Sequence, residues 1–393
     1  MMNSLYHSFQ IVTKPIGAVC NLNCTYCFYL DKINLYKKQS DFRMPDKVLE
    51  AFIRQMIEAQ PANLVSFIWQ GGEPTLLGVS FFQTVIDLQR KYAAGKTIEN
   101  SIQTNGTMLD DEWCGFLKKH EFLVGLSLDG PLELHDYYRK DNKGKGTHDR
   151  VMNGMDCLIK NDVPFNTLTC VNRQNSYFPL EVYRFLKEAG SHYMQFIPIV
   201  ERKNNFSAVT EWSVEADQYG EFLCKIFDEW VKNDVGKYFV QHFDVAMESW
   251  MGKRQSLCIF NKTCGNALAL EHNGDLYSCD HYVNPQNKLG NIMDRPLTDL
   301  VGSEQQHKFS QKKENELPDY CRQCEVRFAC NGGCPKNRFI NTPDGEPGLN
   351  YLCTGYKTFF THIRPYMEFM AGELKNRRPP ANIMQWIKDK KLF

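Results

Sequence analysis

The sequence lacks the features of a nucleic-acid-binding, membrane-spanning or exported protein. It carries no net charge, because 46 Lys and Arg residues balance 46 Asp and Glu residues among 393 positions. No basic surface that would favour nucleic acid or an acidic membrane is therefore expected. No apolar run approaches the ~20 residues of a membrane-spanning helix, and residues 1–14 lack the basic and apolar segments of a signal peptide. We expect a cytoplasmic protein with no nucleic acid and no membrane among its partners.

Cysteine, by contrast, is abundant. The chain has 15 cysteines, and in a reducing cytosol their clustering indicates metal or iron–sulfur ligation rather than disulfides. Cys20, Cys24 and Cys27 have the spacing C-x3-C-x2-C. Three thiolates can bind three irons of a four-iron cluster and leave the fourth iron open for chemistry. We expect four isolated cysteines to be inert, small apolar residues: Cys114, Cys157, Cys170 and Cys224.

A second group of cysteines lies in the last third of the chain. It has eight members, which is the number that two fully ligated four-iron clusters require. Two zinc sites would also use eight thiolates, and the spacing alone does not separate the two metals. The three-cysteine motif on the same chain favours iron–sulfur. The eight residues are Cys258, Cys264, Cys279, Cys321, Cys324, Cys330, Cys334 and Cys353.

Between about residues 9 and 250, short apolar runs alternate with amphipathic segments, which predicts an α/β fold with parallel strands. The pattern does not distinguish a partial barrel from an open sheet, but both bind ligands at the carboxyl ends of the strands. The expected strands are Phe9–Thr13, Val65–Trp69, Ser101–Thr104, Leu123–Leu128, Asn166–Val171 and Met194–Ile199. The expected helices are Pro45–Ala59, Phe81–Ala93, Asp110–Lys119, Arg150–Lys160, Pro179–Ala189 and Val214–Lys232, with Asp110 as an N-cap and Pro45 and Pro179 in first turns.

The loops after the first four strands are expected to face one another on one rim. They contain the cysteine motif and the segments 70–74, 103–107 and 127–131. Gly71 and Gly72 allow the backbone to approach a ligand closely, and Glu73 can pair with a cationic group on that ligand. Each segment alone is also typical of an ordinary turn, but their common placement favours a binding role.

Beyond about residue 250 the periodic pattern ends. The segment 258–353 is rich in Gly, Asn, Asp and Cys, so metal clusters would supply cross-links that an apolar core does not. A last helix is expected at Phe359–Leu374. It precedes a basic tail, Lys375–Lys391, which we expect to pack through Ile383 and Trp386.

Together these motifs resemble the radical S-adenosylmethionine enzymes with a SPASM extension, and more narrowly the anaerobic sulfatase-maturating enzymes. The resemblance covers about residues 9–360. It is carried by the three-cysteine motif with Tyr26, by the segments 27–29, 70–75, 103–107 and 125–131, by the later cysteine pattern and by the segment 279–282. It implies a partial (β/α)6 TIM-like barrel at 1–250, a SPASM iron–sulfur domain at 251–360 and a helical tail at 361–393.

The resemblance also implies three [4Fe-4S] clusters and S-adenosyl-L-methionine. Cys20, Cys24 and Cys27 would hold the cluster whose open iron binds the cofactor. The family crosses its auxiliary ligands, whereas spacing alone would group Cys334 with the three cysteines before it. The implied auxiliary sets are Cys258, Cys264, Cys279 and Cys334 for one cluster, and Cys321, Cys324, Cys330 and Cys353 for the other. The implied cofactor contacts are Tyr26, Gly72, Glu73, Ser127, Arg139 and Met194.

The implied reaction oxidises a Cys or Ser residue of a sulfatase polypeptide to Cα-formylglycine under anaerobic conditions. A 5′-deoxyadenosyl radical removes hydrogen from Cβ, Asp280 accepts a proton, and the auxiliary clusters offer a route for the second electron. Tyr29 and Gln70 lie on the same rim and can contact the peptide or simply pack. Without the resemblance, Asp280 would be interpreted as a turn carboxylate. The electron donor would be a protein such as flavodoxin or ferredoxin.

Three other functions remain open at this point. Another SPASM-type maturase would form thioethers or crosslinks, often with an N-terminal peptide-recognition domain, for which a first strand at about residue 9 leaves no room. A non-enzymatic zinc or iron–sulfur scaffold would bind metal without cleaving the cofactor. Nucleic-acid modification has little support from a chain without net charge.

Overall fold

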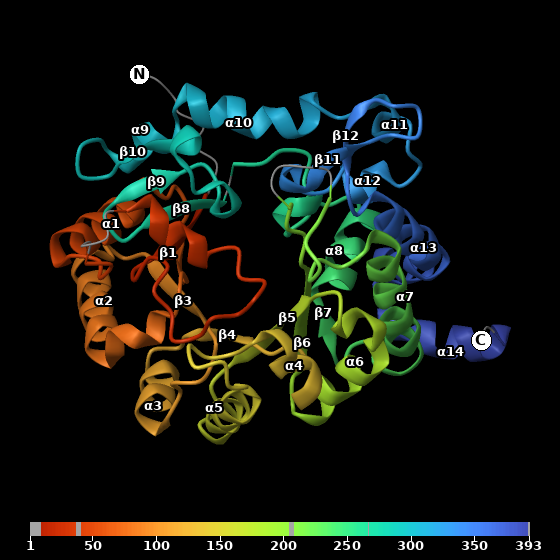
Figure 1. Cartoon of the computed structure of the whole chain (residues 1–393). Coiled ribbons are helices and arrows are strands. Elements are labelled where there is room, and N and C mark those ends of the chain that lie inside the picture. Colours follow the sequence, from red (N-terminus) through yellow and green to blue (C-terminus); the bar gives the residue numbers. More distant parts are fainter. Residues whose placement is uncertain (1–8, 37–40, 204–207, 266, 392–393) are drawn as a thin grey trace. The chain divides into compact units, whose positions relative to one another are not determined.

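The structure is a computed structural model that describes residues 9–36, 41–203, 208–265 and 267–391 (Figure 1). The chain forms two compact units. The first contains the described residues up to Ser127, together with Arg139–Phe165 and Cys264–Lys312. The second contains Leu128–Tyr138, Asn166–Thr263 and the described residues from Lys313 onward.

The first unit is built on parallel strands that alternate with helices. Its strands pair side by side in chain order, all parallel. Val65, Phe67 and Trp69 are buried, as expected for a parallel strand that is covered by helices. The strands are β1 (Gln10–Lys14), β2 (Leu64–Trp69), β3 (Thr97–Thr104) and β4 (Leu123–Ser127), and the helices are α1 (Asp46–Ala59), α2 (Gly78–Tyr92), α3 (Asp111–Lys119) and α5 (His148–Lys160).

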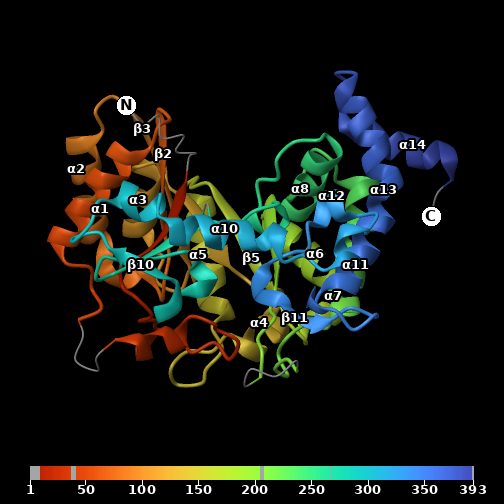
Figure 2. The ribbon, with the colours of Figure 1, turned by 90° about the horizontal axis from the view of Figure 1, so that it is seen from above.

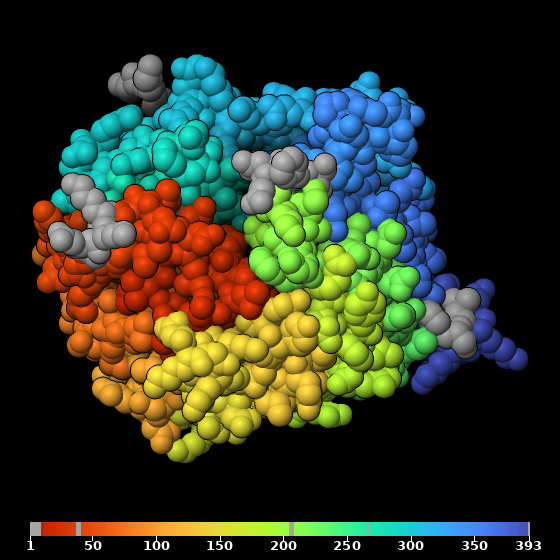
Figure 3. All heavy atoms as spheres, in the orientation of Figure 1, coloured from red at the N-terminus to blue at the C-terminus, as the bar shows by residue number. Residues whose placement is uncertain are grey.

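Part of the cysteine-rich region extends this same sheet. Strand β8 (Ala267–Glu271) pairs in parallel with β1, and β9 (Asp275–Tyr277) and β10 (Lys288–Asn291) continue the sheet in antiparallel order. Figure 3 shows this segment lying directly against the N-terminal segment, although the two are far apart in the sequence. Helices α9 (Leu297–Val301) and α10 (Glu304–Asn315) follow. The carboxyl ends of β1 and β8 therefore lie next to each other.

The second unit contains the other parallel strands and a helical layer. Strands β5, β6 and β7 pair in that order. They are β5 (Phe165–Val171), β6 (Tyr193–Pro198) and β7 (Phe239–Val240), and the helices of this part are α4 (Leu132–Tyr138), α6 (Pro179–Glu188), α7 (Ala216–Asn233) and α8 (Gln241–Trp250).

The long helix α13 (Cys353–Lys375) packs against α7 and α8 (Figure 2). A Cβ atom on Gly355 would lie 2.0 Å from the carbonyl oxygen of Ala216, so glycine is required at this crossing. The basic tail packs as expected, because Ile383 is buried and Trp386 contacts the ring of Phe369. The remaining α-helices and strands are α11 (Asp319–Arg322), α12 (Arg327–Cys330), β11 (Arg338–Asn341), β12 (Pro347–Asn350) and α14 (Ile383–Lys390).

The expected strands are all present, with shifted ends. Strand β3 begins at Thr97 rather than Ser101, because the polar side chain of Asn100 interrupts the apolar pattern but is buried against Trp69 and Gln89. Asp110 is the predicted N-cap and accepts a hydrogen bond from the amide of Trp113 at 2.9 Å.

Two of three helix starts differ in detail from the prediction. Pro179 opens α6 as expected, whereas Pro45 is the N-cap of α1 and not a first-turn residue. Helix α13 begins at Cys353 rather than Phe359. Within the described ranges no helix has the length and apolarity needed to cross a membrane.

Candidate active site

The loop after β1 carries Cys20, Cys24 and Cys27, and the loop after β2 is hydrogen-bonded to its first half. The amide of Gly72 donates to the carbonyl of Gly17 at 2.7 Å, and the amide of Glu73 donates to the carbonyl of Val19 at 2.9 Å. A Cβ atom on Gly72 would lie 1.8 Å from the carbonyl oxygen of Val19. Glycine at position 72 is therefore what allows the two loops to approach.

Gly72→Ala tests this close approach. The added methyl group must displace the backbone of Val19, and overpacking of this kind costs about 1–3 kcal/mol. We expect the loop to shift and the affinity for S-adenosylmethionine to fall about tenfold or more. Equilibrium binding to the reconstituted protein measures this loss. Gly115→Ala is the matched control, since a Cβ atom there meets no neighbouring atom within 4 Å. Unchanged affinity in Gly72→Ala would contradict the prediction.

Glu73 is buried beside these loops, and its carboxylate accepts hydrogen bonds from its own loop and from the end of β3. It accepts hydrogen bonds from the hydroxyls of Thr75 (2.7 Å) and Thr104 (2.8 Å) and from the amide of Asn105 (2.7 Å). Burial raises the pKa of Glu73, and these hydrogen bonds oppose that rise. Glu73 thus connects the loop after β2 to the end of β3. Its predicted contact with the cofactor stays a prediction.

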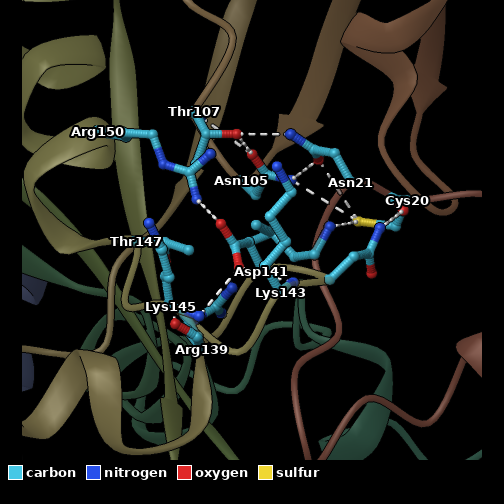
Figure 4. Close-up of polar contacts among 12 residues, drawn as sticks. Cys20, Asn21, Asn105, Thr107, Arg139, Asp141, Lys143, Lys145, Thr147 and Arg150 are labelled. Atoms are coloured by element: carbon cyan, nitrogen blue, oxygen red, sulfur yellow. Dashed lines mark hydrogen bonds and ion pairs between the residues drawn. The ribbon is translucent and has the colours of Figure 1, made fainter.

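The sulfur of Cys20 receives hydrogen bonds from its own loop and from the end of β3 (Figure 4). The amide of Leu22 lies 3.3 Å from this sulfur and the side-chain amide of Asn105 lies 3.7 Å from it. Asn105 also donates to Asn21 at 2.8 Å, and Asn21 donates to the hydroxyl of Thr107 at 2.9 Å. Burial raises the pKa of the Cys20 thiol to about 11, and the amide of Leu22 acts against this rise.

These contacts meet the needs of a cluster ligand. An iron ligand must be the thiolate, and N–H donors stabilise its charge. The segment 103–107 was expected on the ligand-facing rim, but no individual role was predicted for Asn105 or Asn21.

Two further predicted contacts are Ser127, the last residue of β4, and Arg139, which directly follows α4. Gln103 donates to the hydroxyl of Ser127 at 3.0 Å. Arg139 is buried, and its guanidinium carbon lies 5.6 Å from the centre of the Tyr26 ring. The first unit therefore contains five predicted cofactor contacts, namely Tyr26, Gly72, Glu73, Ser127 and Arg139. The sixth, Met194, is buried in β6 of the second unit.

Asp280 forms an ion pair with Lys14, whose ammonium lies 2.6 Å from Oδ1 of the carboxylate. Burial alone would raise the pKa of Asp280, but the charges of Lys14 and His281 outweigh it, so the pKa lies below its usual range. Asp280 is therefore a carboxylate at neutral pH, the form that can accept a proton. Lys14 was missed from the sequence. The signal that could have found it is a charged residue at the end of an apolar strand.

In the second unit, four cysteines line one cavity. Burial, together with the nearby Cys353, Cys321 and Cys324, raises the pKa of Cys330 to about 12. Thiolates this close repel one another, and an iron–sulfur cluster stabilises such a set of donors. The cavity contains the second ligand set implied by the resemblance: Cys321, Cys324, Cys330 and Cys353.

The other implied set is divided between the two units. Cys264 and Cys279 lie in the first unit, and Cys258 and Cys334 lie in the second. Their assignment to one shared cluster, rather than the grouping that spacing alone suggests, stays a prediction.

Comparison with known proteins agrees with this geometry. The family model of the radical SAM superfamily matches residues 15–194, and that of an iron–sulfur cluster-binding domain matches residues 258–325. A serine-type anaerobic sulfatase-maturating enzyme of Bacteroides thetaiotaomicron is 49% identical, with 96% of this chain and 95% of that protein aligned. A cysteine-type enzyme of Clostridium perfringens is 34% identical, with 93% of this chain and 99% of that protein aligned.

A solved structure gives the same result for the fold. Native anSMEcpe with bound AdoMet and Cp18Cys peptide has a TM-score of 0.84 and 34% identity, over 94% of this chain and all of that one. The chain has the partial (β/α)6 barrel and the SPASM region of these proteins, and it resembles them over nearly its whole length. Together with the cysteine motif and the glycine loop beside it, this similarity shows that the chain belongs to the family of anaerobic sulfatase-maturating enzymes.

Proposed function

We propose that this chain oxidises a serine residue of a sulfatase polypeptide to Cα-formylglycine. The observation that carries the proposal is the 49% identity, over nearly the whole chain, to a serine-type enzyme, against 34% to a cysteine-type enzyme. The sequence alone left the choice between Cys and Ser open. A serine target also gives the simpler chemistry, because removal of two hydrogens converts its CH2OH group directly to the aldehyde.

The chain offers ligands for each cofactor that this reaction needs. Cys20, Cys24 and Cys27 would hold the first [4Fe-4S] cluster, and the two later cysteine sets would hold the auxiliary clusters. When bound, the clusters and S-adenosylmethionine supply the radical that takes a hydrogen atom from Cβ and the acceptor for the remaining electron. The proposed contacts to S-adenosylmethionine are Tyr26, Gly72, Glu73, Ser127, Arg139 and Met194.

The protein's own residues handle the proton and the orientation of the target. After a hydrogen atom has left Cβ, the hydroxyl of the target serine must lose a proton as well as an electron to become an aldehyde. We assign proton acceptance to the carboxylate of Asp280. The ring of Tyr29 and the side-chain amide of Gln70 belong to the same group of contacts around Lys14. We assign both residues to contact with the target.

Three further assignments belong to this proposal. The change near residue 250 from periodic apolar segments to a cysteine-rich segment supports a radical SAM part at 1–250, a SPASM part at 251–360 and a tail at 361–393. The compact units of the fold follow other boundaries. The 15 cysteines support a reducing cytoplasmic location. The electron that starts each turnover would come from a flavodoxin or ferredoxin.

Anaerobic turnover of two sulfatase-motif peptides, identical except for Ser or Cys at the target position, tests the proposal. We expect the serine peptide to lose two hydrogens, about 2 Da by mass spectrometry. Conversion of the cysteine peptide alone would contradict the serine assignment. If neither peptide changes while S-adenosylmethionine is still cleaved, the substrate is another polypeptide, as for a different SPASM-type maturase.

A further inference from the structure

Lys14 lies at the centre of the polar groups around Asp280. Its side chain is 1% exposed, which is unusual for a lysine, because a buried ammonium needs partners that replace water. The ammonium lies 2.6 Å from Asp280 Oδ1 and 2.9 Å from Gln70 Oε1. It also lies 4.4 Å from the centre of the Tyr29 ring. Three side chains from three different loops therefore contact one cation.

The backbone fixes this arrangement. Lys14 is the last residue of β1 and is paired in register with Glu271, the last residue of β8. The chain then turns through β9 and reaches Asp280 directly afterwards. The loop after β2 is also attached to β1, because the backbone amide of Gln70 donates to the backbone carbonyl of Thr13 at 2.8 Å. Strand pairing thus brings the partners of Lys14 together from distant parts of the sequence.

Tyr29 connects this group to a second buried carboxylate. Its hydroxyl donates to Glu271, and both side chains are buried. The ring of Tyr29 therefore has its hydroxyl held by Glu271 while its face lies against the ammonium of Lys14. The same lysine that pairs with Asp280 consequently limits the orientations of Tyr29.

We propose that Lys14 is a positioning residue, whose ammonium holds the Asp280 carboxylate, the Gln70 amide and the Tyr29 ring in the single arrangement that receives the target side chain of the peptide. This inference rests on the proposed function, since it assigns Lys14 a role in that reaction. Lys14 acts through Asp280 and does not itself take part in the chemistry. Its loss frees the carboxylate to adopt other orientations, and a small displacement of a catalytic group is costly in rate.

The proposal predicts uncoupling rather than general loss of activity. In Lys14→Met, which keeps the length and apolar stem, we expect cleavage of S-adenosylmethionine to continue. The formylglycine formed per 5′-deoxyadenosine should fall at least tenfold. The value of kcat for product should fall more than KM for the peptide rises, because the orientation of the base is lost and not the binding of the peptide. Iron content and circular dichroism verify that the holoenzyme is intact.

The combination with Asp280→Asn distinguishes positioning from a general structural role. If Lys14 acts through Asp280, the double variant will form as much formylglycine per 5′-deoxyadenosine as Asp280→Asn alone. The effects of substitutions within one network of contacts are not additive. Losses that multiply in the double variant would overturn the proposal, as would wild-type coupling in Lys14→Met.

Two further variants keep the test decisive if Lys14→Met does not fold. Lys14→Arg retains the positive charge and Lys14→Gln removes it while both keep a polar head. If Lys14→Arg forms more formylglycine per 5′-deoxyadenosine than Lys14→Gln, the proposal is supported. Equal values for the two variants overturn it. Wild-type enzyme with the serine peptide is the reference. If the wild type forms no formylglycine the proposed function fails, whereas full coupling in the lysine variants overturns only the role of Lys14.

Discussion

Replacing Cys24 by alanine is expected to abolish cleavage of S-adenosylmethionine while the rest of the chain stays folded. Two thiolates cannot hold a four-iron cluster that three thiolates bind with one open corner. Cys24 lies in a loop and outside the buried core, so its loss removes little apolar packing. We expect iron to fall from about twelve to about eight per chain and 5′-deoxyadenosine to fall to background. Iron analysis and chromatography of the anaerobic reaction measure the two effects.

A second cysteine variant provides a matched comparison. Cys324→Ala removes a ligand of the proposed auxiliary set that lines the cavity in the second unit. It should also lose about four irons, yet retain cleavage of S-adenosylmethionine while formylglycine decreases. Cys224→Ala, on α7 and outside every proposed ligand set, should change neither quantity. Cofactor cleavage by Cys24→Ala at the wild-type rate would show that the first motif does not hold the reactive cluster.

Those features of the fold that depend on local sequence could be predicted. The strands of the parallel sheet are short apolar runs bounded by turn residues, and β2 is typical in having Val65, Phe67 and Trp69 buried. Helix α10 was missed because Glu304–Asn315 is mostly polar and has no apolar periodicity. Strand β8 was missed for a different reason. Its partner β1 lies far away in the sequence, and nothing local to Ala267–Glu271 specifies that pairing.

The same distinction applies to the site. The cysteine ligands could be proposed from spacing and resemblance, because their chemistry is specific to the residue type. Lys14 and Glu271 could not, because they become neighbours only through the pairing of β1 with β8. Glu73 was expected to face a ligand. Its hydrogen bonds to Thr104 and Asn105 show a connecting role between two loops, which the motif alone does not reveal.

Asp280→Asn is expected to separate the two halves of the reaction. The substitution keeps the size of the side chain and removes the charge that pairs with Lys14. Formation of the radical does not need this carboxylate, so cleavage of S-adenosylmethionine should remain close to wild type. Loss of the proton from the target residue does need it, and positioned bases typically contribute about 10²–10⁴-fold in rate. Formylglycine per 5′-deoxyadenosine should therefore fall by a factor in that range.

The control for Asp280→Asn is another carboxylate of the first unit that also forms an ion pair but has no proposed role. Asp275 is buried and lies 2.8 Å from the ammonium of Lys288, so Asp275→Asn also breaks an ion pair in the same part of the first unit. We expect this variant to lose some stability but to form as much formylglycine per 5′-deoxyadenosine as the wild type. Among the residues that the structure describes, the groups found around Lys14 are Asp280, Gln70 and Tyr29, and Asp275 is not one of them. Equal uncoupling in both variants would mean that the ion pairs support only the local fold. Uncoupling confined to Asp280→Asn would assign the proton to this carboxylate.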